Sequence, residues 1–96
     1  MNLARKGDAV LGHEAFPPTT IEEGSPDVFC NGKEVARLGD SCGQHQSPEP
    51  QPPHPRKISS GSPSVFANSK KVAMLFSSID CGGMVIQGSP DVYAES

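Results

Sequence analysis

The sequence predicts a small all-β fold, and three observations support this: abundant Gly and Pro, a turn motif that occurs three times, and two hairpin signals. Ten of the 96 residues are Gly and ten are Pro. Both residue types interrupt helices and mark turns. The longest stretch that contains neither runs from Ser64 to Cys81, so at most one ordinary helix could form. A helical bundle is therefore excluded.

The turn motif is Gly-Ser-Pro-x-Val-aromatic. It occurs as Gly24–Phe29, Gly61–Phe66 and Gly88–Tyr93. Proline presets φ and cannot donate a hydrogen bond to a neighbouring strand, so it belongs just before strand pairing begins. Each copy therefore predicts a tight turn that leads into a short strand.

Two of the three copies continue into a hairpin signal. The first is followed by Asn31-Gly32 between short β-prone runs, which is the strongest local hairpin pattern. The second is followed by Asn68-Ser69 at the same place. The third copy stops at the C-terminus, so its hairpin partner is expected to be missing.

A second pattern extends the repeat. Ala4–Asp8 matches Ala36–Asp40, and a histidine follows each aspartate by five residues, as His13 and His45. The third unit has no histidine at this place but contains Cys81 nearby. The chain therefore reads as three degenerate units, the first truncated at its front and the last at its back. Repeats that cannot bury a face alone pack together, which predicts pseudo-threefold symmetry within one chain.

The composition allows one domain, residues 1–96, with a limited core. Hydrophobic residues make up 34% of the chain and only five residues are aromatic. A domain of this size often needs stabilisation beyond its core. Segment 46–55 holds five prolines and is expected to be an exposed loop of polyproline character, with a ligand for an aromatic-lined groove as the alternative.

The charge pattern excludes several partners. The net charge of −3 gives no basic field that would attract nucleic acid or an anionic membrane. No apolar run is long enough for a transmembrane helix, and the N-terminus lacks the apolar core of a signal peptide. We expect synthesis in a cytoplasm without conventional export. No nucleophile elbow, phosphate loop or paired-carboxylate pattern is present, so an enzyme is not expected.

The histidines and cysteines indicate a metal site. Three cysteines cannot form a complete disulfide framework, and imidazole and thiolate together suit zinc. In symmetric units His13 and His45 would converge near the axis, and Cys81 would add a third ligand. The fourth donor is His54 or Cys42. A closed zinc site in a small peptide contributes about 10–16 kcal/mol to apparent stability.

Other polar residues have plainer interpretations. Cys30 follows Val28-Phe29 within a predicted strand and is expected to be a small buried residue. Asp8 and Asp40 lie in Gly-Asp turns, where aspartate caps nearby backbone donors. The alternative is that these aspartates orient ligand imidazoles.

Taken together, these motifs resemble the PAAR-repeat proteins found at the tips of contractile injection machines. The matching pieces, in order, are Ala4–Asp8 with His13, Gly24–Asp40 with His45, His54, Gly61–Met74, Asp80–Gly82 and Ile86–Val92. The resemblance covers nearly the whole chain. The naming Pro-Ala-Ala-Arg tetrapeptide is degenerate here, as Glu34–Arg37 and Lys71–Met74.

The resemblance implies a small cone of short strands with one zinc ion near its apex. Its broad base would cap a trimeric β-helical spike, one monomer per trimer. That spike is the valine-glycine repeat protein of type VI secretion or a phage tail spike. The family's three-histidine, one-cysteine site maps onto His13, His45, His54 and Cys81, with Cys42 as runner-up and iron less expected than zinc.

The function implied is a non-enzymatic tip that sharpens the spike, contacts the target membrane transiently and is delivered outside the cell. Effectors are further partners that the resemblance suggests, and no effector extension is expected in this chain. The alternative function is a small zinc-containing binding or adaptor module outside such a machine. A third hypothesis is a zinc hydrolase. Catalytic zinc keeps one position for water, so if His54 were not a ligand the site would open and hydrolase assays would become worthwhile.

Overall fold

The computed structural model describes residues 1–11, 19–43, 56–80 and 82–94, and within these ranges the chain forms only short strands, bridges and turns. The strands within these ranges are β1 (Ala9–Leu11), β2 (Thr19–Thr20), β3 (Phe29–Cys30), β4 (Lys33–Glu34), β5 (Ser41–Cys42), β6 (Arg56–Lys57), β7 (Phe66–Ala67), β8 (Lys70–Lys71) and β9 (Met84–Val85). The prediction of an all-β fold is confirmed.

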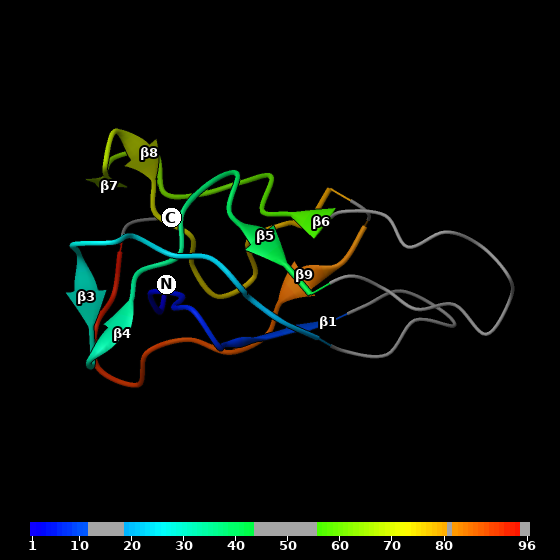
Figure 1. Cartoon of the computed structure of the whole chain (residues 1–96), viewed down its shortest axis with the longest axis horizontal. Coiled ribbons are helices and arrows are strands. Elements are labelled where there is room, and N and C mark those ends of the chain that lie inside the picture. Colours follow the sequence, from blue (N-terminus) through cyan, green and yellow to red (C-terminus); the bar gives the residue numbers. More distant parts are fainter. Residues whose placement is uncertain (12–18, 44–55, 81, 95–96) are drawn as a thin grey trace, which may run out of the picture.

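The strands form one three-stranded sheet, in the order β2-β1-β9, and the pairs β3-β4, β5-β6 and β7-β8. Figure 1 shows the β3-β4 and β7-β8 hairpins at one end of the molecule, while β1, β5, β6 and β9 lie farther along its length. Both hairpins were predicted. Their turns use positive φ at two successive residues, 56° and 76° at Asn31-Gly32 and 54° and 65° at Asn68-Ser69. Such turns match the right-handed twist of paired strands.

Three buried alanines connect the three repeats. The amide of Ala4 donates to the carbonyl of Ala73 (2.9 Å), that of Ala73 to Ala36 (2.9 Å), and that of Ala36 back to Ala4 (3.1 Å). None of the three is exposed to solvent. Each repeat is thus hydrogen-bonded to both of the others in a closed ring. The small alanine side chain suits a place where three backbones approach this closely.

The core on either side of this ring is also built from recurring positions. One cluster contains Ala4, Val10, Ile21, Ala36, Cys42, Ile58, Ala73, Ile79 and Val85, and a second contains Leu3, Cys30, Val35, Ala67, Val72, Met74 and Ala94. In the first cluster Cys42 has the place that Val10 and Ile79 have in the other repeats, since each pairs with an Ile or Val of a neighbouring repeat. Cys42 is 2% exposed, as a core residue would be.

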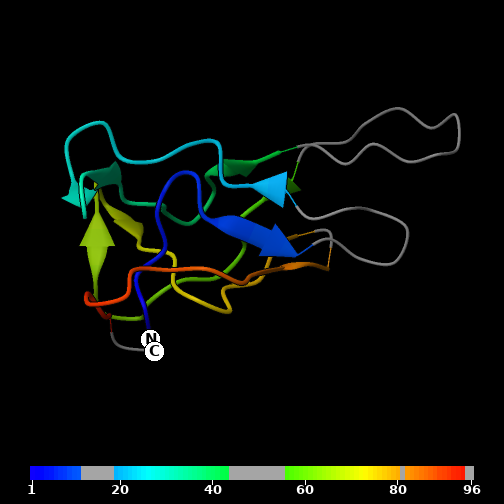
Figure 2. The same ribbon diagram turned by 90° about the horizontal axis from the view of Figure 1, so that it is seen from below.

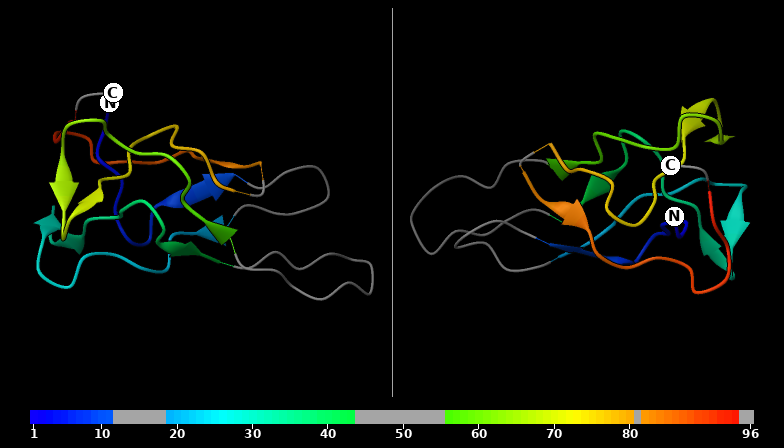
Figure 3. Two further views of the ribbon diagram at one scale, coloured as in Figure 1. Left: turned by 90° about the horizontal axis from the view of Figure 1, so that it is seen from above. Right: turned by 180° about the vertical axis from the view of Figure 1, so that it is seen from behind.

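The first residues of the chain complete the third repeat. Leu3 donates from its amide to Val92 O (2.9 Å), Ala94 donates to Met1 O (2.8 Å), and Asn2 bridges to Tyr93. Figures 2 and 3 show the N-terminus beside the described end of the chain. The third copy is therefore paired not through a hairpin, as the first two are, but with the first residues of the chain. A strand edge accepts any segment with free backbone groups, and here that segment comes from the other end of the sequence.

Candidate functional site

The end of the molecule that carries the hairpins exposes a set of apolar side chains that recurs in each repeat. Phe29, Phe66 and Tyr93 are 58%, 55% and 64% exposed, and the valine before each of them is exposed as well. They come from β3, β7 and the segment that pairs with the N-terminus, which lie together at this end (Figures 1 and 3). We call this surface, made of Val28, Phe29, Val65, Phe66, Val92 and Tyr93, the aromatic end.

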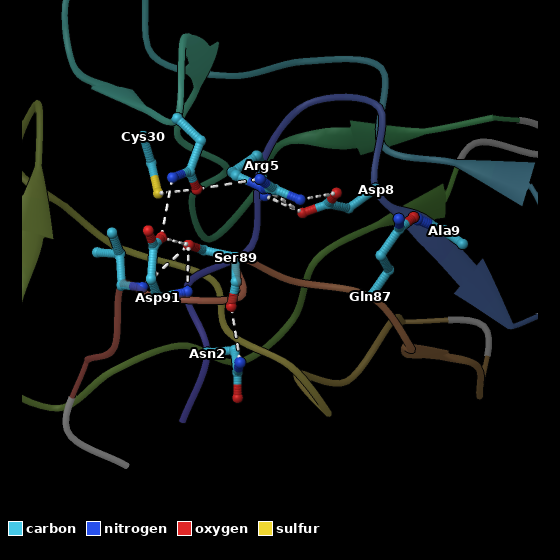
Figure 4. A network of polar contacts seen from close by, with 10 residues as sticks. Asn2, Arg5, Asp8, Ala9, Cys30, Gln87, Ser89 and Asp91 are labelled. Carbon is cyan, nitrogen blue, oxygen red and sulfur yellow. Dashed lines mark hydrogen bonds and ion pairs between the residues drawn. The ribbon is translucent and has the colours of Figure 1, made fainter.

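Behind the aromatic end lies a buried ion pair. Asp8 Oδ2 accepts hydrogen bonds from the backbone amide of Arg5 (2.8 Å) and from its Nε (2.9 Å), and Oδ1 accepts one from Nη2 (2.9 Å). Figure 4 shows the two side chains facing one another. The hydrogen bond to Asp8 raises the pKa of the Arg5 guanidinium against the opposing effect of burial. Arg37 and Asp40 make the same three contacts at 2.8, 2.9 and 2.8 Å. The structure thus supports the capping interpretation of both aspartates.

The third repeat keeps only the backbone part of this arrangement. Met74 and Ser77 stand where the other repeats have arginine and aspartate, and the Met74 amide donates to Ser77 Oγ (2.9 Å). An apolar side chain and a hydroxyl therefore replace the charged pair without leaving the amide unsatisfied. Aligning the three units shows that methionine and serine replace arginine and aspartate. It does not show that the two replaced residues contact one another.

A chain of hydrogen bonds leads from each ion pair to the aromatic end. Arg5 Nη1 donates to Asn31 Oδ1 (3.0 Å), and Asn31 Nδ2 donates to Asp91 Oδ1 (2.9 Å). Figure 4 shows Arg5 and Asp91 on either side of this link. The second chain consists of Arg37, Asn68 and Asp27, with distances of 3.0 and 2.8 Å. The hairpin turns are thereby tied to the turns of a neighbouring repeat.

Replacing Asn68 by glycine is expected to raise the pKa of Asp27 toward its ordinary value, as followed by NMR titration of the carboxyl carbons. Hydrogen bonds from Asn68 and then from Ser25 lower that pKa in the folded protein. Glycine keeps the positive φ and removes the amide. The native contribution to stability is present at neutral pH and is lost as the pH falls through the lowered pKa. Asp91, whose partner is Asn31, is the internal control, and an unchanged Asp27 titration would contradict the assignment.

The four metal ligands implied by the resemblance lie outside the described residues, and so does the proline-rich segment 46–55. Within the described ranges no group of three or more His, Cys, Asp or Glu side chains could hold a metal. Each predicted histidine ligand is, however, two residues from the nearest described residue, and Cys81, which lies between the described Asp80 and Gly82, is two residues from Gly83. These anchors are Leu11, Gly43, Arg56 and Gly83, for His13, His45, His54 and Cys81 respectively.

The four anchors are brought together by the fully buried side chain of Arg56. Its Nη2 donates to Leu11 O (3.3 Å) and its Nη1 to Thr19 Oγ1 (3.2 Å), and the Thr19 hydroxyl donates to Gly43 O (3.3 Å). A Cβ on Gly83 would lie 2.2 Å from Leu11 O and 2.9 Å from Arg56 Nη2, so only glycine fits there. Sequence reasoning did not identify Arg56, because no motif distinguishes a buried arginine from an exposed one.

The two cysteines within the described residues are both buried. Cys30 Sγ lies 3.2 Å from Asn31 Oδ1 behind the aromatic end, which confirms its prediction as a small buried residue. Cys42 lies in β5, paired in register with Arg56. Its place in the core supports a packing role. Its part as an alternative ligand stays a prediction.

Comparison with known proteins agrees with the fold and the motifs. In the described part of the chain no helix is long and apolar enough to cross a bilayer. None of the curated proteins matches the sequence. The sequence model of the PAAR motif family matches residues 11–87, which is most of the chain. The repeats, the strand-only architecture and this match together show that the chain belongs to the PAAR motif family.

Proposed function

We propose that this protein is the tip that caps and sharpens the trimeric β-helical spike of a contractile injection machine, either a type VI secretion system or a phage tail. Membership of the PAAR motif family, which is structural rather than enzymatic, is consistent with this role. The observation that carries the proposal is the aromatic end, where one Val-aromatic pair from each repeat is exposed at the same end of the molecule.

A partner with three identical chains offers three equal surfaces, and a monomer can meet all three only if it presents three similar surfaces itself. The closed ring of hydrogen bonds among Ala4, Ala36 and Ala73 supports an arrangement of the repeats about a pseudo-threefold axis. The end of a β-helix has unpaired strand edges that invite aggregation unless covered. Exposed aromatic residues are the kind that bury well in protein interfaces. One chain per trimer is the stoichiometry that follows.

We further propose that His13, His45, His54 and Cys81 hold one structural zinc ion at the opposite end. Two residues of chain reach at most about 7 Å, so four ligands can meet at one ion only if their anchors are close. Arg56 and Thr19 hold those anchors together through the contacts described above. Three imidazoles and one thiolate suit a closed tetrahedral zinc site, and iron accepts the same donors less typically. Bound zinc would cross-link distant parts of the chain and slow forced unfolding as the tip enters a membrane.

The docking proposal is tested with the purified trimeric spike protein encoded in the same genome, by light scattering coupled to gel filtration. We expect one chain per spike trimer. The triple variant Phe29→Asp, Phe66→Asp, Tyr93→Asp should abolish this complex, because three buried charges would be left without partners.

The matched control changes the charge of residues on the sides of the molecule, as Glu22→Lys with Lys57→Glu. This control should bind as the wild type does and keep the same mass ratio. Full binding by the triple variant, or a ratio of three chains per trimer, would overturn the proposal.

A further inference from the structure

One side of the molecule differs in character from the other two at four equivalent positions. We call its surface the Phe76 patch. It consists of Leu11, Phe76, Met84 and Ile86. All four side chains are exposed, while Val85, which lies between two of them in the chain, is fully buried. Alternation along a strand therefore turns Met84 and Ile86 to the same solvent side.

Backbone contacts hold the patch together. Leu11 of β1 is directly opposite Met84 of β9 in the antiparallel register, so their side chains share a face. The Phe76 amide donates to Val85 O (2.8 Å), which places Phe76 beside the strand residue between Met84 and Ile86. The patch is thus one continuous group from three segments of the chain.

The other two sides serve as internal references, because the same hydrogen bond recurs on each. Gly7 donates to Ile21 O (2.8 Å) and Gly39 donates to Ile58 O (2.8 Å), as Phe76 does to Val85. The residues in the places of Phe76, Met84, Ile86 and Leu11 are then Gly7, Thr20, Glu22 and Gly43 on one side, and Gly39, Lys57, Ser59 and Asp80 on the other. Four apolar residues on one side thus correspond only to glycines and polar or charged residues elsewhere.

Phe76 also has an unfavourable backbone conformation. Its φ is 73°, in the left-handed region where a bulky residue is an outlier, and both equivalent residues are glycines, with φ of 92° and 90°. Its side chain is 58% exposed, so packing within the chain does not account for it. Strain of this kind that brings no internal benefit is typical of functional positions.

The absence of charged residues around the patch indicates the chemical class of its partner. No Asp, Glu, Lys or Arg occurs in residues 72–79 or 82–90, the parts of the third repeat that form this side. A membrane-binding surface usually adds basic residues around its apolar anchors. A trimeric spike would need the same feature on all three sides. A single uncharged patch with one projecting aromatic residue matches an uncharged apolar segment of one protein chain.

We propose that the Phe76 patch docks a second protein through such an apolar segment, one copy per tip. This surface is separate from the aromatic end, so one tip can bind the spike and this partner at once. Because only the third repeat carries this apolar patch, one of the three sides binds the partner, and one partner binds each tip.

The first experiment places the photo-reactive residue p-benzoylphenylalanine at position 76 in the producing cell. We expect one discrete adduct with a second protein, identified by mass spectrometry. The identified protein is then purified and titrated against the wild type and two variants by calorimetry. Phe76→Gly and Ile86→Glu should each weaken binding at least about 30-fold, as loss of an interface hot spot does. Glycine and glutamate are the residues found at these places on another side, so the fold should tolerate both.

Phe76→Gly should also raise the melting temperature by a few degrees, because it relieves the backbone strain. Weaker binding by a more stable protein cannot be attributed to misfolding. The triple variant of the aromatic end, Phe29→Asp with Phe66→Asp and Tyr93→Asp, is the control that should lose the spike and keep the partner. Four outcomes would overturn the proposal: no protein adduct, unchanged affinity in Phe76→Gly, dimers of the tip through the patch, or binding to phosphatidylglycerol vesicles that depends on Phe76.

Discussion

Replacing Asp40 by serine alone is expected to destabilise the protein by about 3–5 kcal/mol, because the Arg37 guanidinium would stay buried without its carboxylate. This is a large part of the total stability of a small domain, which is commonly about 5–15 kcal/mol. Urea unfolding of the purified protein measures the loss of stability. The midpoint should fall while the dependence on urea concentration stays the same.

The third repeat supplies the control for this prediction. The double variant Arg37→Met, Asp40→Ser recreates the pair that Met74 and Ser77 form, in which the backbone amide is still satisfied. We expect it to recover most of the loss, to within about 2 kcal/mol of the wild type, because no unpaired charge remains. The remaining cost is the lost hydrogen bond from Arg37 to Asn68. A double variant as unstable as Asp40→Ser would show that the charge itself is needed.

Removal of the zinc ion that we propose is expected to have an even larger effect, unfolding the chain or lowering its melting temperature by tens of degrees. Structural zinc in small domains contributes about 10–16 kcal/mol to apparent stability. Protein purified without added metal or a histidine tag should contain one zinc per chain by elemental analysis. His13→Ala and Cys81→Ser should each lose the metal and the stability together. Retention of one tight zinc by both variants would refute the site, and iron in its place would change the metal but not the ligands.

Two cysteine variants complete this test. Cys42→Val should keep its zinc and its stability, since Val10 has the equivalent core position. Loss of zinc in Cys42→Val with retention in His54→Ala would make Cys42 the fourth ligand. Cys30→Ala, at the opposite end of the molecule, should keep the metal in either case and serves as the control for loss of a buried thiol.

The two buried ion pairs and the alanine ring also explain how so small a core holds the repeats together. Each Arg–Asp pair caps a turn. Its arginine also donates a hydrogen bond to the asparagine of a hairpin turn, Arg5 to Asn31 and Arg37 to Asn68. The asparagine then joins an aspartate of a neighbouring repeat. In the third repeat Met74 cannot extend this connection, and Ser64 stands where the other turn motifs have aspartate. The third repeat thus lacks both the arginine and the aspartate that begin and end the hydrogen-bond chain in the other two cases.

By itself the sequence determined what depends on neighbouring residues. The Gly-Ser-Pro turns, the hairpins at Asn31-Gly32 and Asn68-Ser69, and the capping roles of Asp8 and Asp40 all follow from residues within four positions of one another. Such turns have few allowed backbone conformations, and only certain residues adopt them readily. The strand-only architecture follows, because these turns leave no room for long helices.

Only the tertiary structure decided which distant residues meet. The first three residues complete the third repeat, Arg56 gathers anchors from four parts of the chain, and Phe76 joins Leu11 and Met84 in one patch. The spacing of the repeats predicted that His13 and His45 converge. It did not predict that the buried Arg56 brings together the residues beside them. These contacts depend on how three similar units close on one another, and the free energy of closure comes from burial and hydrogen bonds between units. The sequence pattern within one repeat therefore does not predict these contacts between repeats.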